Sequence, residues 1–191
     1  MNLLQLPQMV FTAHGGWDEI ERTRPDKRQM FFEYALPMSL LPPAMILFAA
    51  DGLGATRFPD IPYSLWLLSA LLFLVLELLS VPLMAKVIRA VARSSGAHAT
   101  EHDAFMIATL APIPLWLSSL VLLQDQVWLI FAVPLLLLIA TASLIRHGVE
   151  RMFRVSEPVR ADEISFVVIS FGILVWMALL ASVLLPLLAS R

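Results

Sequence analysis

The chain has 191 residues, of which 59% are hydrophobic and only 15% are charged, and it contains no cysteine. Soluble domains average roughly 45–50% apolar and about 25% charged residues, so a disordered chain, a coiled coil and an ordinary soluble enzyme are excluded. Without cysteine, disulfides, thiolate metal sites and cysteine nucleophiles are excluded as well. A net charge of −2 gives no reason to expect a nucleic-acid partner. The composition predicts an all-α polytopic transmembrane bundle.

Residues 1–33 are predicted to form a cytoplasmic tail in front of a membrane domain at 34–188. The tail's first apolar residues recur at helical spacing, which predicts a short amphipathic helix lying in the membrane interface. These residues are Leu3, Leu6, Met9 and Val10. Trp17 and Ile20 continue an apolar face, so the tail either packs on the inner end of the bundle or docks a partner.

Five apolar stretches follow the tail, and each is long enough to cross a hydrocarbon core of ~30 Å. Because a backbone inside a bilayer must satisfy its own hydrogen bonds, each stretch is predicted to be a helix. The predicted spans are Tyr34–Ala50, Ser64–Ala85, Ala104–Leu123, Val127–Ile145 and Ile164–Leu188.

The basic residues predict the orientation of these spans. Eleven of the 13 lysines and arginines lie in the tail and in the loops after the second and fourth spans, whereas Arg57 and Arg191 lie on the other side. The positive-inside rule then places the N-terminus in the cytoplasm and the C-terminus outside. An odd number of spans is required by this arrangement.

Eight of the 13 prolines fall within the predicted spans. A proline removes a backbone donor and kinks a helix, which neighbouring helices in a membrane can tolerate. Broken helices form substrate sites in some transporters, although curved, tightly packed helices are the commoner result. The kinks expected to matter most lie at Pro42, Pro43, Pro112, Pro114 and Pro134.

Several short motifs accompany the spans. They are Trp17-Asp18-Glu19-Ile20 in the tail, Pro-Leu-Trp-Leu at Pro114–Leu117, Pro134 in the fourth span, and Gly148, Met152 and Val155 after it. Together with the five spans, these motifs resemble the Yip-one domain family (Ypt/Rab-interacting-type five-span membrane proteins), in particular its bacterial inner-membrane branch.

The resemblance implies a five-helix bundle in a bacterial cytoplasmic membrane, with a cytoplasmic N-terminus and no enzymatic activity. Eukaryotic members bind small GTPases and shape or sort membranes, but that partner is not expected in a bacterium. We therefore expect membrane organisation or scaffolding without a cofactor. Membrane lipids are the expected partners; a homo-oligomer and an unidentified protein partner on the cytoplasmic face are also compatible with the sequence.

Glu77 is the only ionisable residue well inside a predicted span. A charge at mid-bilayer costs at least ~2.5 kcal/mol, so we expect this carboxyl to be protonated, paired or facing a polar cavity. Ser80 lies three residues further on, on the same side of the helix. The two residues form either a structural contact between helices or, as the alternative, the site of a small transporter or channel with proline-kinked helices.

His98, Glu101 and His102 form a His-x-x-Glu-His pattern. On a helix the two histidines would lie one turn apart and could bind zinc, with the glutamate as a base. On this hypothesis the chain is a metal-binding membrane protein. The other interpretation is a polar helix start capped by Thr100 or Asp103.

An expected lipid- or partner-binding face completes the candidate sites. Arginines near a membrane surface bind anionic lipid headgroups at ~1 kcal/mol each, although membrane topology alone also accounts for them. The residues expected on this face are Trp17, Arg89, Arg93, Arg151 and Arg154.

Overall fold

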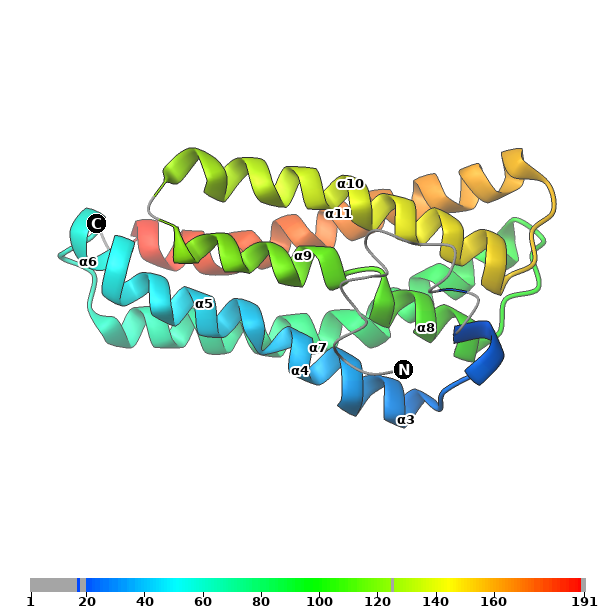
Figure 1. Cartoon of the computed structure of the whole chain (residues 1–191), viewed down its shortest axis with the longest axis horizontal. Coiled ribbons are helices and arrows are strands. Elements are labelled where there is room, and N and C mark those ends of the chain that lie inside the picture. Colours follow the sequence, from blue (N-terminus) through cyan, green and yellow to red (C-terminus); the bar gives the residue numbers. More distant parts are fainter. Residues whose placement is uncertain (1–16, 18–19, 125, 190–191) are drawn as a thin grey trace.

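A computed structural model describes residue 17 and residues 20–124 and 126–189; most of these residues are helical and none of them forms a strand (Figure 1). Five helical segments are long and apolar enough to cross a membrane, which confirms the predicted number of spans. They are Lys27–Arg57, Tyr63–Ser94, Glu101–Leu123, Val127–Met152 and Pro158–Ala189. The amphipathic helix predicted near the N-terminus lies outside the described residues.

The first span begins at Lys27 rather than Tyr34 and is assembled from short pieces. These are α3 (Lys27–Met30), η2 (Phe31–Ala35), α4 (Leu36–Ser39), α5 (Leu41–Ala49), η3 (Ala50–Gly54) and α6 (Ala55–Arg57). The helix stops at Ser39 and starts again at Leu41, with Pro42 in the first turn of α5. A proline there loses no hydrogen bond, whereas inside a helix its ring would clash with the preceding turn. The helix therefore restarts at Pro42, one of the positions where a kink is expected.

The third span is broken in the same way. It consists of α8 (Glu101–Leu110), α9 (Ile113–Ser118) and η4 (Ser119–Leu123). Pro112 lies in the gap between α8 and α9, and Pro114 lies in the first turn of α9. The carbonyl oxygen of Pro112 accepts a hydrogen bond from the amide of Trp116 at 3.0 Å, which restarts the helix. This second break therefore also coincides with prolines at which a kink is expected.

The other three spans are continuous helices, α7 (Tyr63–Ser94), α10 (Val127–Met152) and α11 (Pro158–Ala189). Helix α10 continues through Pro134, so this proline does not interrupt its span. At about 1.5 Å per residue, α7 is roughly 48 Å long, well beyond a hydrocarbon core of ~30 Å. Its last turns therefore extend past the apolar part of a membrane.

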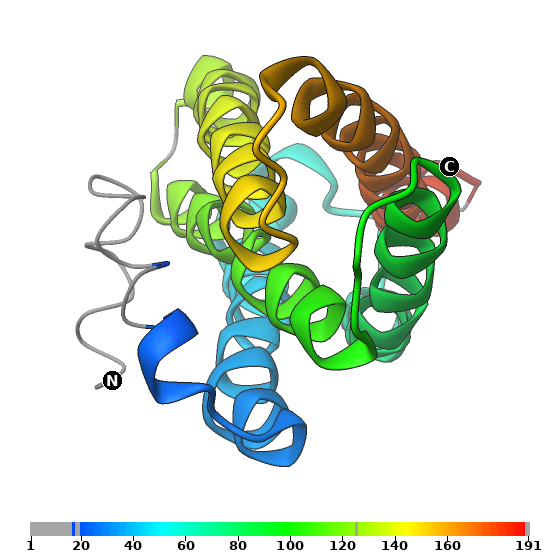
Figure 2. The same cartoon turned by 90° about the vertical axis from the view of Figure 1, so that its right-hand side faces the viewer.

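The spans pack around a common centre, as the end-on view in Figure 2 shows. One end of the bundle, on the right in Figure 1, combines residues 20–30, the last turns of α7 and α10 and the first turns of α8 and α11. We call it the basic end, because every described lysine and arginine except Arg57 belongs to these segments or, in the case of Arg154, to the loop between α10 and α11. The basic residues of the tail and of the segments around the two loops therefore lie together at one end of the bundle.

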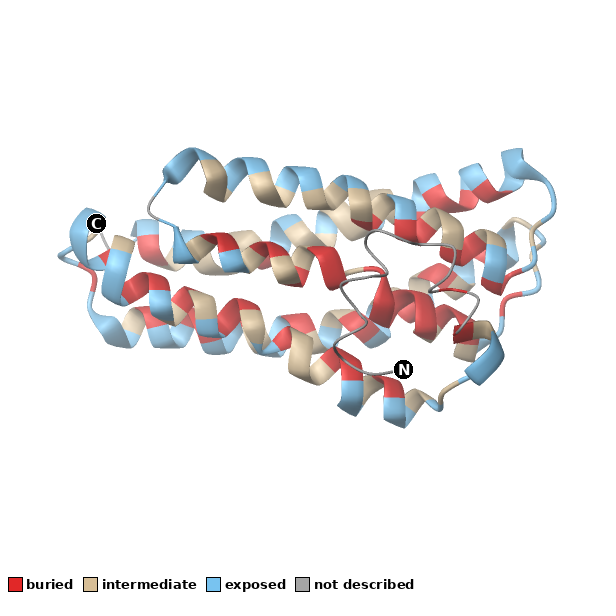
Figure 3. Ribbon diagram, viewed as in Figure 1, coloured by how far each residue is buried: buried red, intermediate tan, exposed pale blue. Residues whose placement is uncertain are grey.

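Buried residues form two separate clusters (Figure 3). The larger cluster lies toward the basic end and includes Ile88, Ile107 and Val149, and it also contains the alanine stripe Ala104, Ala108 and Ala111. Alanines at this spacing let helices approach closely. The smaller cluster lies toward the far end and is contributed by these residues: Ile46, Ala50, Ile61, Trp66, Ala70, Phe73, Leu179 and Leu187.

Trp17 is part of the larger cluster, with only 1% of its surface exposed. Its ring lies over Gly148 of α10, where an added Cβ would come within 2.7 Å of the ring. Glu21 follows, and its carboxylate pairs with Arg151 at 3.3 Å and Arg154 at 3.5 Å. Of the two interpretations of the tail, Trp17 thus follows the one in which it packs on the bundle, because the glycine leaves a recess that the large apolar ring fills. The expected placement of Trp17 on a lipid- or partner-binding face is accordingly corrected.

Candidate functional site

Glu77 lies halfway along α7 and is buried, with 4% of its surface exposed. Its Oε1 accepts a hydrogen bond from the indole Nε1 of Trp116 at 2.6 Å, which joins α7 to α9. A buried polar group needs such a partner, because losing one inside an apolar medium costs several kcal/mol. Glu77 thus makes a contact between helices, the first of the two arrangements that its position in the sequence allows.

The contact joins α7 and α9, and neighbouring residues in each helix position its half of the contact. Phe73 and Val81 lie one turn before and after Glu77, and they belong to the smaller and the larger buried cluster respectively. Trp116 is brought to the same depth by α9, whose start is fixed at Pro112. The Glu77–Trp116 hydrogen bond therefore lies at the junction between the two clusters.

Ser80 does not reach the carboxyl group. Its hydroxyl donates a hydrogen bond to the backbone carbonyl of Glu77 at 2.7 Å. A serine hydroxyl that bonds to its own helix has used its only proton and cannot donate to the side chain three residues earlier. Ser80 therefore lies near Glu77, as expected, but its hydroxyl binds the helix backbone and not the carboxyl group.

A cavity of about 580 Å³ adjoins Glu77. Its wall is formed by α5, α7, α8, α9, η4, α10 and α11, and Glu77 is the one ionisable residue among the described residues that line it. The polar side chains in the wall include Ser80, Ser118 and Thr141. The remaining lining is largely aliphatic and aromatic, so this is an apolar chamber with a small polar spot.

At the basic end, acidic residues of α8 connect it to neighbouring helices. Glu101 pairs with Lys27 of α3 at 2.7 Å and with Arg89 of α7 at 3.5 Å. Asp103 is buried and lies 3.5 Å from Arg24. Exposed ion pairs contribute only about 0–1 kcal/mol each, so they mainly fix positions.

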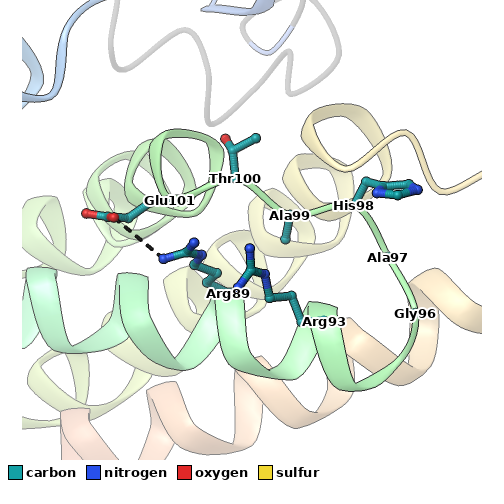
Figure 4. Close-up of a pocket in the computed structure, with 8 residues that line it drawn as sticks. All are labelled: Arg89, Arg93, Gly96, Ala97, His98, Ala99, Thr100 and Glu101. Atoms are coloured by element: carbon teal, nitrogen blue, oxygen red, sulfur yellow. Dashed lines mark ion pairs between the residues drawn. The ribbon is translucent and has the colours of Figure 1, made fainter.

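Arg89 and Arg93 lie together beside the loop that joins α7 to α8 (Figure 4). The loop turns sharply at Gly96, whose φ of 75° favours glycine, and the amide of Ala97 donates to the carbonyl oxygen of Ala92 at 2.9 Å. A pocket of about 560 Å³ lies between the loop and the two arginines. Arg93 makes no ion pair with a described residue, which leaves its charge available at this pocket.

The three residues of the predicted metal site are not arranged as ligands. Helix α8 begins at Glu101, so His98 lies in the loop and is not one helical turn from His102. Glu101 instead faces Arg89, and His98 points away from it (Figure 4). No group of three histidine, aspartate or glutamate side chains within the described ranges is placed to hold a metal ion. The histidines fail to align because Thr100, and not a residue before His98, caps the helix.

Comparison with known protein families shows the family to which this bundle belongs. Residues 9–180 match the Yip1 domain. The chain belongs to the Yip1 domain family. No curated protein and no solved structure matches it. The family and the five apolar helices together identify a multi-pass membrane protein, and the match confirms the resemblance to this family that the sequence motifs carry.

Within this Yip1 domain, sequence reasoning missed the pairing of Glu77 with Trp116. A signal was available, because Glu77 lies 17 residues before the end of α7 and Trp116 lies 15 residues after the start of α8. At 1.5 Å per residue, both side chains are roughly 22–26 Å from the basic end. Matching depths in consecutive antiparallel spans could have predicted the contact.

The start of α8 gives a first testable prediction. Thr100 Oγ1 accepts a hydrogen bond from the amide of Asp103 at 3.1 Å and donates to its carboxylate. We expect Thr100→Ala to lower the free energy of unfolding by about 1 kcal/mol, because a helix N-cap is lost. Unfolding in mixed micelles would measure it. The control is Ser94→Ala, since Ser94 bonds only to a carbonyl of its own helix; an equal loss there would contradict the capping role.

Proposed function

We propose that this Yip1 domain protein is a non-enzymatic organiser of a bacterial cytoplasmic membrane, with its basic end in the cytoplasm. The observation that carries the proposal is that Arg89 and Arg93 both line one pocket at that end. An anionic lipid headgroup or an acidic segment of a partner protein is the chemistry that such a pocket attracts.

The surroundings of the pocket support this role. Arg89 is held by Glu101, while Arg93 has no described acidic partner, so the pocket combines an oriented guanidinium with an unpaired one. Arg151 and Arg154 lie at the same end and are held by Glu21. A face that is fixed by ion pairs and retains spare positive charge is suited to holding lipid headgroups in place.

Anionic lipid retention tests the proposal. We expect Arg93→Gln to reduce the number of phosphatidylglycerol molecules that remain bound, relative to phosphatidylcholine, by several-fold, because a cation near a membrane surface is worth ~1 kcal/mol. Native mass spectrometry of the purified protein would count them. The matched control is Arg57→Gln, which removes the same charge at the far end. Equal retention by wild type and Arg93→Gln would overturn the proposal.

The orientation has its own test. We expect a reporter that is active only in the cytoplasm to work when fused before the first span and to fail when fused after the last one, because the positive-inside rule places the basic end inside. The paired measurement uses a reporter active only outside the membrane. A C-terminal fusion that is active in the cytoplasm would contradict both the orientation and the proposed cytoplasmic role of the arginines.

Transport through the bundle is the second candidate function, and the cavity beside Glu77 is the observation that favours it. Coupled transport generally uses several ionisable groups at one depth, whereas the described cavity wall contributes one. A proton-dependent flux in liposomes that Glu77→Gln abolishes would favour transport over membrane organisation.

A further inference from the structure

The helices of the bundle leave the cavity beside Glu77 unfilled, and α10 packs only loosely along it. Among the described residues of α10, none from Val127 to Ala140 is buried, whereas buried residues recur from Thr141 onward. Five residues of this unburied half nevertheless line the cavity: Ile130, Phe131, Pro134, Leu135 and Leu138. One side of this half of α10 therefore borders the cavity, and the half is coloured only exposed or intermediate in Figure 3.

Two polar atoms in the cavity wall have no hydrogen-bond partner among the described residues. They are Glu77 Oε2 and Thr141 Oγ1, and both belong to side chains that are more than nine-tenths inaccessible. Unsatisfied polar atoms in an apolar interior are costly, so their presence beside an unfilled space indicates that a polar group can join them. Since Oε1 of Glu77 is held by Trp116, the free oxygen is the one available for a ligand.

The cavity also has the size and chemistry of a ligand site. Its volume of about 580 Å³ falls within the roughly 300–1,000 Å³ of typical small-molecule pockets. Such pockets combine an apolar lining with a few placed polar groups. Because the cavity lies between membrane-spanning helices and is lined mostly by hydrocarbon side chains, its occupant must dissolve in the bilayer.

We propose that this cavity binds one neutral, membrane-soluble molecule with a long hydrocarbon chain and a single hydroxyl or carbonyl group, which Glu77 holds at mid-depth. A phospholipid does not fit this description, because its polar group remains at the membrane surface. The inference goes beyond the role proposed for the basic end and does not depend on it, since Arg93 takes no part in this site.

A dibrominated octadecanol is a suitable probe, because bromine quenches tryptophan fluorescence at short range and Trp116 and Trp176 line the cavity. Gly172 of α11 lies on the cavity-lining stripe with Val168, Val175 and Leu179, and an added Cβ there meets nothing within 4 Å. Gly172→Leu thus extends into free space without a clash. Gly52→Leu is the matched control, since Gly52 is equally open and lies outside the cavity.

We expect saturable quenching at one alcohol per chain in the wild type, at least tenfold weaker binding in Gly172→Leu, and no change in Gly52→Leu. Dibrominated octadecane, which lacks the hydroxyl, should bind at least fivefold more weakly than the alcohol, and Glu77→Leu should remove that difference. Elution as a single species on size exclusion verifies folding of each variant. Quenching that does not saturate, or that is the same in Gly172→Leu, would overturn the proposal, because the alcohol would then reach the tryptophans from outside the cavity. Equal binding of alcohol and alkane to the wild type would overturn the role of Glu77.

Discussion

Replacing Trp17 by alanine is expected to lower the free energy of unfolding by about 3–5 kcal/mol, the usual cost of removing a large aromatic ring from a packed core. The ring is 1% exposed and fills the recess above Gly148. Its loss should also release the adjoining Glu21 from Arg151 and Arg154. Unfolding in mixed micelles gives the energy, and limited proteolysis of the N-terminal segment gives the local effect.

The matched control is Trp128→Ala, because Trp128 is 65% exposed at the far end of the bundle. A surface substitution of this kind usually changes stability by less than about 0.5 kcal/mol. The glycine side of the contact can be tested as well. Gly148→Leu would place its Cβ 2.7 Å from the Trp17 ring and 3.2 Å from Ile107, so overpacking should cost about 1–3 kcal/mol.

Combining Gly148→Leu with Trp17→Ala should cost less than the sum of the two single changes, because the leucine can occupy the space that the ring leaves. Additive effects would show that the ring and the glycine do not pack together. A loss below about 1 kcal/mol for Trp17→Ala alone would show that the N-terminal segment is not docked on the bundle.

The number of spans and two of their breaks could be predicted from the sequence, because they depend on local properties. The length of an apolar run decides whether it can cross a bilayer, and a proline disfavours the interior of a helix because it lacks the amide donor and its ring clashes with the preceding turn. Pro42 and Pro112 meet this expectation, whereas α10 continues through Pro134. A single proline in a long apolar helix can be accommodated when nearby groups re-satisfy the freed carbonyl, and sequence alone does not reveal those groups.

The contacts of Trp17, His98 and Glu77 depend on how the helices are rotated and on where each begins. Trp17 in a polar tail could face lipid, solvent or the bundle, and only the small size of Gly148, far away in sequence, decides for the bundle. His98 loses its helical relation to His102 because the helix starts three residues later. The spans α10 and α11 are apolar nearly all round, so their sequences specify a membrane helix without specifying which side faces the cavity.

Trp116→Phe is the second substitution with a large expected effect. It keeps an aromatic ring but removes the indole donor, which leaves both carboxyl oxygens of Glu77 without a hydrogen bond. A buried acceptor that loses its partner costs about 1–3 kcal/mol, so the free energy of unfolding should fall by that amount. Mixed-micelle unfolding again provides the measurement. Trp176→Phe is the matched control, because Trp176 lines the same cavity and makes no hydrogen bond with a described residue.

A substitution of the acceptor separates the hydrogen bond from the packing of the ring. Glu77→Gln keeps an amide oxygen that can accept from Trp116 Nε1, so its cost should be well below that of Trp116→Phe. Combining Trp116→Phe with Glu77→Leu makes both positions apolar and should recover most of the loss, because no orphaned polar group remains. If the double variant is instead less stable than Trp116→Phe alone, the hydrogen bond is not what Trp116 contributes, and the junction between the two buried clusters is held by ring packing.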